Sequence, residues 1–231
     1  MGLDLVAFVR DVFGREDLPG HGMQRADHGD HLVRLLSEIV REEIPGDVVE
    51  LGCNAGLTAV VLQATLDELG STKRLHVFDS FEGLPPLSKQ DGATTYEPGT
   101  CAAPPELLVA NFRRFGRRLP VMHPGWFSQT LPRELPEPIA FAHLDADLYE
   151  STVEGLRFTY PRLAAGSAIV IHDYFDPTTR EGVPDGESLE RLITLPGVHR
   201  AVSEFLVGRR EKAHVLISAG WQSGQGYIRK E

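Results

Sequence analysis

Cysteine is scarce in this sequence, with only Cys53 and Cys101 in 231 residues. Two cysteines do not make the disulfide framework of small secreted proteins, so we expect a reducing, cytoplasmic compartment. Long apolar runs are also missing, and none approaches the roughly 20 residues that span a bilayer. Charged residues interrupt the first twenty positions. We therefore expect neither a membrane span nor a signal peptide.

Basic residues are outnumbered, because 23 Lys and Arg face 33 Asp and Glu, a net charge of -10. Such a surface repels phosphate backbones and anionic lipids, so we expect no nucleic-acid or membrane partner. The length suits one core, which predicts a single domain over residues 1–231, with 1–30 as an N-terminal extension. An amphipathic helix at 3–13 offers a surface for a partner subunit, so a homo-oligomer is possible.

Two common nucleotide-binding signatures are also absent: G-x-G-x-x-G and the Lys-Ser/Thr ending of a phosphate-binding loop. The chain instead carries a short apolar strand at 48–51, the glycines Gly52 and Gly56, and an apolar helical run at 57–69. A strand, a tight turn and a helix N-terminus direct backbone N–H groups and a positive dipole end toward a ligand. The alternative is an ordinary turn whose glycines serve geometry alone.

Acidic residues end the first two predicted strands. Glu50 would repel a pyrophosphate but accept a hydrogen bond from a cationic amine, which favours S-adenosylmethionine over NAD or ATP. Asp79 lies 23 residues beyond Gly56, an offset at which nucleoside-binding folds place an acid on the ribose hydroxyls. The alternative for Asp79 is a turn or helix-cap aspartate. The predicted cofactor-binding residues are Glu50, Gly52, Asn54, Gly56, Asp79 and Ser80.

Strands and helices alternate along the chain. This pattern predicts an α/β fold, a Rossmann-like doubly wound and mostly parallel sheet that binds ligands at the carboxyl ends of its strands. Two final strands, at 213–218 and 226–229, would form an antiparallel edge. The long polar segment at 80–105 is interpreted as a lid loop. The other predicted strands are 74–79, 119–123, 139–144 and 167–171, and the other predicted helices are 31–44, 106–115, 149–160 and 196–207.

A polar cluster is expected where the strands at 139–144 and 167–171 end. Asp145 and Asp147 follow the first of these, and His172 and Asp173 follow the second. Carboxylates held together repel and raise one another's pKa, and a divalent cation would relieve that repulsion. Oxygen ligands suit Mg²⁺, whereas His172 would also admit Mn²⁺ or another transition metal. The alternatives are helix caps for Asp145 and Asp173 and, for His172, a core position bonded to a backbone carbonyl.

Several segments of the chain resemble the macrocin O-methyltransferase family, from about residue 24 to the C-terminus. They are Pro45–Gly52, Phe78–Pro85, Gly125–Phe127 with Thr130–Pro132, Leu144–Thr152, Gly166–Tyr174 and Val198–Leu206. The resemblance implies the class I methyltransferase type of fold. It also implies methylation of a hydroxyl that depends on S-adenosylmethionine and Mg²⁺, usually on a deoxysugar or aromatic part of a bacterial natural product, as in antibiotic biosynthesis.

The resemblance also implies site residues. The family's first metal aspartate matches Asp145, and its Asp-Asp pair falls on His172 and Asp173, so a histidine replaces one aspartate here. The predicted metal ligands are therefore Asp145, His172 and Asp173. The carboxylate suggested as a base in this family matches Asp147. His143 is a competing catalytic base, although it lies within a strand and could belong to the core.

The expected function is methyl transfer from S-adenosylmethionine to a hydroxyl of a small-molecule acceptor, a natural-product sugar, with metal assistance. One alternative is a metal-free methyltransferase of a related family that uses a His/Asp acid–base pair. A second is an NAD-dependent oxidoreductase, against which the missing glycine motif counts. A third is a non-catalytic nucleoside-binding protein, against which the polar cluster counts because unused buried polar groups are costly.

Overall fold

A seven-stranded sheet forms the centre of the protein, in the order β3-β2-β1-β4-β5-β7-β6. The computed structural model describes residues 2–175, 195–216 and 224–231. The first five strands are parallel, and β7 runs antiparallel to both β5 and β6. The strands are β1 Asp47–Leu51, β2 Leu75–Asp79, β3 Val121–Pro124, β4 Ile139–Leu144, β5 Leu163–His172, β6 His214–Leu216 and β7 Gln225–Arg229.

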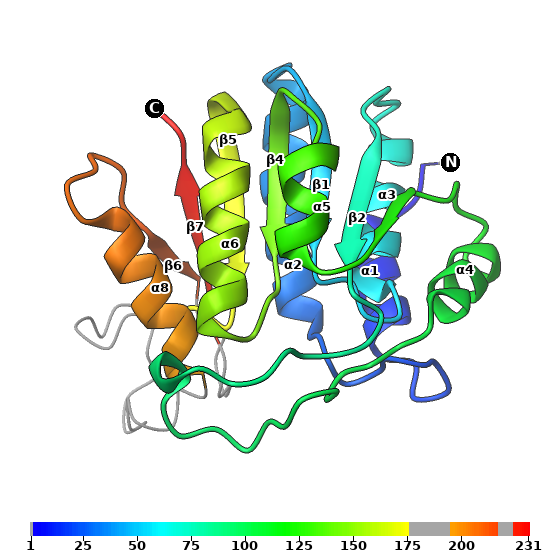
Figure 1. Cartoon of the computed structure of the whole chain (residues 1–231). Coiled ribbons are helices and arrows are strands. Elements are labelled where there is room, and N and C mark those ends of the chain that lie inside the picture. Colours follow the sequence, from blue (N-terminus) through cyan, green and yellow to red (C-terminus); the bar gives the residue numbers. More distant parts are fainter. Residues whose placement is uncertain (1, 176–194, 217–223) are drawn as a thin grey trace, which may run out of the picture.

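Helices cover both faces of this sheet (Figure 1). On one face lie α1 Leu5–Phe13, α2 Ala26–Arg41 and α3 Leu57–Glu68, and on the other lie α5 Phe127–Glu134, α6 Tyr149–Thr159 and α8 Pro196–Leu206. The remaining described helices are α4 Pro105–Arg114, next to α3, and the short 3₁₀ helices η1 Lys89–Asp91 and η2 Tyr160–Arg162. The predicted doubly wound sheet with an antiparallel edge is confirmed. Positions 217 and 218 of the predicted strand 213–218 lie outside the described residues.

Apolar patterning explains the two layers. All six residues of β4 are buried, as expected for a central strand covered on both faces. In β1, Val48 packs into the core beneath α1, α2 and α3, while the next residue, Val49, packs into the core beneath α5, α6 and α8. Successive side chains of a strand point to opposite faces. A short valine-rich strand therefore joins the two cores.

The N-terminal helix α1 uses its apolar side within the chain. Val9 and Val12 are fully buried, and the helix packs against α2 and α3. The stripe that suggested a partner surface thus contributes to the core. No helix in the described part of the chain has both the length and the apolar composition to cross a membrane.

Helix α5 was not predicted from the sequence. It is eight residues long and contains Pro132 near its end. Proline indicates a helix boundary, because its ring blocks the preceding turn and it lacks an N–H donor. In α5 the proline lies in the last turn, where the helix ends. It marks the end of a short helix, which the sequence analysis did not recognise.

The carboxyl ends of the parallel strands form one edge, which points downward in Figure 1, and residues 80–104 cross it. Two contacts fix this crossing segment. Asn54 Nδ2 donates to the carbonyl oxygen of Cys101 at 2.7 Å. Asp91 Oδ1 accepts from the backbone N–H of Tyr149 at 2.6 Å, and Tyr149 begins α6. A remote aspartate therefore caps α6, whose own preceding residue supplies no side-chain cap.

Candidate active site

A cavity of about 880 Å³ opens at the carboxyl edge of the sheet. It lies where the connections from β1 and β4 diverge to opposite sides, the position at which open α/β sheets bind ligands. Eight predicted site residues line it: Gly52, Asn54, Asp79, Ser80, Asp145, Asp147, His172 and Asp173. Glu50, Gly56 and His143 are not on its wall.

Asp79 builds the turn that follows β1. Its Oδ2 accepts hydrogen bonds from the backbone N–H groups of Cys53 and Asn54, each at 2.8 Å. Its Oδ1 accepts from the backbone N–H of Phe81, also at 2.8 Å. A carboxylate offers about four acceptor positions, so one position, on Oδ1, is left for a ligand. The residue predicted to contact ribose is therefore also the support of the glycine turn.

Packing within the protein explains why both positions of the turn are glycine. Gly52 has φ +84°, and a Cβ there would lie 1.8 Å from the carbonyl oxygen of Asp145. Gly56 has φ +78°, and its Cβ would lie 2.6 Å from Leu108 Cγ on α4. Close approach to β4 and α4 is thus sufficient to require glycine. The roles predicted for both glycines toward a cofactor stay predictions.

Glu50 and His143 form a fully buried pair beneath the cavity. His143 Nδ1 lies 3.0 Å from Glu50 Oε1, and both side chains have no exposed surface. Burial raises the pKa of Glu50 well above its usual value, and the nearby Asp145 and Asp79 raise it further. Burial lowers the pKa of His143 to about 4. The histidine therefore acts here as a neutral ring held by a carboxyl partner.

Three predicted residues form a carboxylate group in the cavity. Asp145, Asp147 and Asp173 each place a carboxylate oxygen within 4.8 Å of the other two. Burial raises the pKa of Asp147 well above its usual value, and Asp145 and Asp173 add to this. Burial also raises the pKa of Asp145, although His172 opposes the shift. Such a set of hard oxygen donors suits a small divalent cation.

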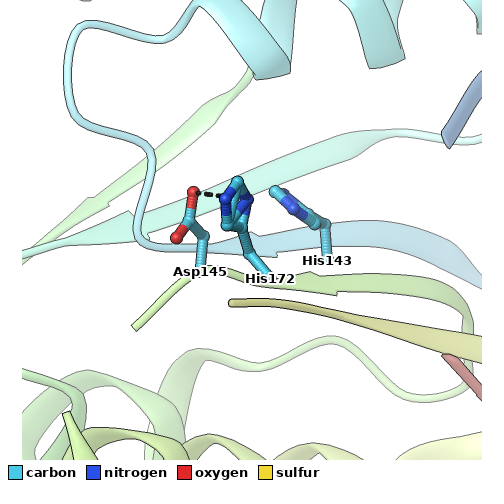
Figure 2. Close-up of side chains that lie close together, drawn as sticks. All are labelled: His143, Asp145 and His172. Atoms are coloured by element: carbon cyan, nitrogen blue, oxygen red, sulfur yellow. Dashed lines mark ion pairs between the residues drawn. The ribbon is translucent and has the colours of Figure 1, made fainter. Parts of the chain in front are cut away.

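His172 lies between two members of the carboxylate group. Its Nδ1 is 3.7 Å from Asp145 Oδ2, and its Nε2 is 3.5 Å from Asp173 Oδ1. Burial lowers the pKa of His172, but Asp145, Asp173 and Glu50 outweigh that effect and leave the pKa raised. Because opposite nitrogens face the two carboxylates, the ring meets them on different sides. A second group of ligand atoms within 4.8 Å consists of His143, Asp145 and His172 (Figure 2).

Sequence reasoning missed Gln24. Its Nε2 donates to Asp145 Oδ2 at 2.7 Å and to His172 Nδ1 at 2.8 Å. Gln24 comes from the loop before α2, and nothing in that loop marks one polar residue over another. Other wall residues that carried no chemical signal are Met23, Tyr96, Glu150 and Glu154. The residues that select the acceptor are also expected to come from 80–105 and 174–195, and positions 176–194 lie outside the described residues.

Comparison with known proteins identifies the family. The chain matches the family described as Macrocin-O-methyltransferase (TylF) over residues 13–192. The chain belongs to this family. It is 35% identical, over 174 residues, to 8-demethyl-8-(2,3-dimethoxy-alpha-L-rhamnosyl)-tetracenomycin-C 4'-O-methyltransferase of Streptomyces olivaceus, an alignment that covers 71% of the chain and 67% of the relative. The predicted family and the predicted enzyme class, an O-methyltransferase, are confirmed, and the oxidoreductase alternative is not supported.

Solved structures agree on the fold. The O-methyltransferase NovP superposes with a TM-score of 0.75 at 20% identity, covering 98% of this chain and 97% of NovP. TomG from Streptomyces achromogenes, solved in complex with SAM, superposes with a TM-score of 0.60 at 16% identity, covering 100% and 92% of the two chains. At these identities the likeness establishes the architecture alone.

The account of Gly52 gives a stability prediction. Gly52→Ala should lower the free energy of unfolding, measured by urea titration, much more than Gly70→Ala. Both glycines have positive φ, but a Cβ at Gly70 meets nothing within 4 Å. Gly70→Ala should therefore cost only the backbone conformation, about 1–2 kcal/mol. The contact with Asp145 should add about 1–3 kcal/mol at Gly52. Equal losses in the two variants would contradict the packing explanation.

Proposed function

We propose that this O-methyltransferase transfers the methyl group of S-adenosylmethionine to a hydroxyl of a small molecule, a sugar of a bacterial natural product, with assistance from a metal ion. The observation that carries the proposal is the carboxylate group of Asp145, Asp147 and Asp173 in the same cavity as Asp79. One part of the cavity suits a nucleoside, and the other suits a cation and a hydroxyl that must lose its proton.

The cofactor is assigned to the turn after β1 and the end of β2. The remaining acceptor position on Asp79 Oδ1 takes a ribose hydroxyl, and Asn54 and Ser80 flank it on the cavity wall. Gly52 and Gly56 shape the turn. Glu50 lies beneath the cavity wall, and we assign the methionine amine to its buried Oε2 because that oxygen has no hydrogen-bond partner in the described residues. The acidic wall also attracts a cationic sulfonium ligand.

The acceptor is assigned to the part of the cavity beyond the cofactor. Tyr96, Trp126 and Phe127 line the same cavity as the carboxylates, and together these side chains give the mixed apolar and polar lining typical of small-molecule sites. The relative from Streptomyces olivaceus is named for a rhamnosyl substrate, which supports a sugar as the group that carries the hydroxyl.

The metal is assigned to Asp145 and Asp173, with His172 beside them. When bound, a divalent cation supplies a Lewis acid that lowers the pKa of the acceptor hydroxyl. Asp147 accepts the hydroxyl proton on a carboxylate oxygen while the sulfonium methyl lies in line with the acceptor oxygen. Asp147 lies on the cavity wall, and a carboxylate oxygen of it is within 4.8 Å of those of Asp145 and Asp173. His143 is the weaker candidate because Glu50 engages its Nδ1 and burial lowers its pKa to about 4.

A metal-free mechanism has one specific observation in its favour. His172 lies between Asp145 and Asp173, and these carboxylates raise its pKa despite burial. A protonated His172 would supply the positive charge that a cation otherwise brings. In that mechanism the imidazolium orients the hydroxyl, and Asp147 still takes the proton.

The cofactor assignment predicts that Asp79→Asn weakens S-adenosylhomocysteine binding by at least about tenfold in calorimetry, since a hydrogen bond to a charged group is lost. Asp47→Asn is the matched control. Asp47 also accepts a backbone N–H, that of Arg74 at 2.9 Å, but it lies at the start of β1, away from the cavity. An unchanged dissociation constant in Asp79→Asn, with the fold intact by circular dichroism, would remove Asp79 from the cofactor site.

The assignment of the base predicts that Asp147→Asn lowers kcat by about 10²–10⁴-fold and leaves the S-adenosylhomocysteine dissociation constant unchanged. Transfer of labelled methyl to a panel of glycosylated acceptors measures the rate. The control is Glu82→Gln, an exposed acid on the segment that crosses the sheet edge, which should keep the wild-type rate. A wild-type kcat in Asp147→Asn would exclude it as the base.

A further inference from the structure

A second possible set of metal ligands consists of His143, Asp145 and His172. The proposed methyl transfer does not use these three residues together. One ligand atom of each lies within 4.8 Å of the others, and Figure 2 shows the three side chains next to one another, with His172 between the other two in this view. The 3.7 Å between His172 Nδ1 and Asp145 Oδ2 fits two ligands that share one ion at about 2.1 Å from each.

His143 has the surroundings of a metal ligand. Glu50 engages its Nδ1, while its Nε2 is buried and has no hydrogen-bond partner in the described part of the chain. Histidines that bind metals donate their second ring N–H to a carboxylate, which fixes the tautomer and the ring orientation. With the shared proton on Nδ1 and Glu50 as its acceptor, the Nε2 lone pair is free for an ion.

His172 also has a carboxylate next to one ring nitrogen, but here that nitrogen is Nε2 rather than Nδ1. Its Nε2 faces Asp173 Oδ1 at 3.5 Å, and its Nδ1 faces Asp145. A proton on Nε2 therefore meets a carboxylate, and the lone pair on Nδ1 turns toward Asp145. Both histidines thus have a carboxylate behind one nitrogen.

Gln24, in the loop before α2, contacts two members of this ligand group. Its Nε2 donates to both Asp145 Oδ2 and His172 Nδ1, so the amide nitrogen lies between two acceptors as a cation would. Its Oε1 is buried without a hydrogen-bond partner. Rotation of the amide by half a turn would direct this oxygen toward an ion between the same two atoms. Gln24 therefore offers a fourth ligand.

We propose that His143, Asp145 and His172, with Gln24, bind a borderline transition-metal ion of the Zn²⁺ and Co²⁺ class. Two imidazoles and one carboxylate favour such ions, whereas Mg²⁺ favours oxygen ligands. The proposed Mg²⁺ site on Asp145 and Asp173 differs from this one in having oxygen ligands. The two sites share Asp145, so an ion in one changes the charge at the other. The proposal holds whichever reaction the cavity performs.

The test is a metal titration of the full protein after treatment with chelator, followed by Co²⁺ absorption and calorimetry. His143→Gln should weaken Co²⁺ binding by at least about tenfold and leave the Mg²⁺ dependence of the thermal shift unchanged. Asp173→Asn should weaken the Mg²⁺ response more than it weakens Co²⁺ binding, because Asp173 is a proposed Mg²⁺ ligand but only lies behind His172 in the other group. His76→Gln is the matched control: this buried histidine contacts His123 and Asp47, outside both groups, and its loss should leave both affinities unchanged.

Equal Co²⁺ affinity in His143→Gln and wild type would overturn the proposal. If circular dichroism shows that His143→Gln does not fold, pulsed EPR of Cu²⁺ bound to the wild-type protein decides. Coupling to two imidazole rings is expected, and coupling to one ring or none would overturn the site. These readouts do not use methyl transfer, so failure of the metal site and failure of the proposed function are distinguishable.

Discussion

The repulsion among Asp145, Asp147 and Asp173 is the constraint on which the site depends. Their carboxylate oxygens lie within 4.8 Å of one another, and burial raises the pKa of both Asp145 and Asp147. Removing charged groups from water costs several kcal/mol for each ion unless a partner compensates. The sheet imposes this arrangement, because β4 and β5 are neighbours and end at the same edge. A cation, a cationic ligand or a proton must offset it, and each of these belongs to the proposed chemistry.

On the cofactor side of the cavity, the carboxylate of Asp79 holds the backbone in place. Asp79 accepts three backbone N–H groups and so links the end of β2 to the turn after β1. Gly52 in this turn lies so close to the carbonyl oxygen of Asp145 that a residue with a Cβ would not fit. The protein's own contacts therefore join the ends of β1, β2 and β4.

The sequence was sufficient for the sheet and for most of the site. Valine-rich strands and their helices have strong periodic patterns, and the acidic residues after each strand follow from the topology, so Asp79, Asp145, Asp147 and Asp173 could be placed at one edge. Contacts between distant segments could not be predicted in this way. The cap that Asp91 places on α6 and the contact of Gln24 with Asp145 and His172 depend on how loops cross the edge. The same holds for Glu50, whose partner His143 comes from the neighbouring strand β4.

The most direct test is transfer of a labelled methyl group from S-adenosylmethionine to a glycosylated acceptor, with the product examined by NMR, by enzyme that has been dialysed against chelator. We predict no transfer in excess EDTA and recovery on adding Mg²⁺, with the label on a sugar oxygen. Binding of S-adenosylhomocysteine should survive chelation, because the proposed cofactor residues Glu50 and Asp79 lie outside the carboxylate group. Full transfer by the dialysed enzyme in excess EDTA would contradict metal assistance. A label on carbon or nitrogen would contradict O-methylation itself.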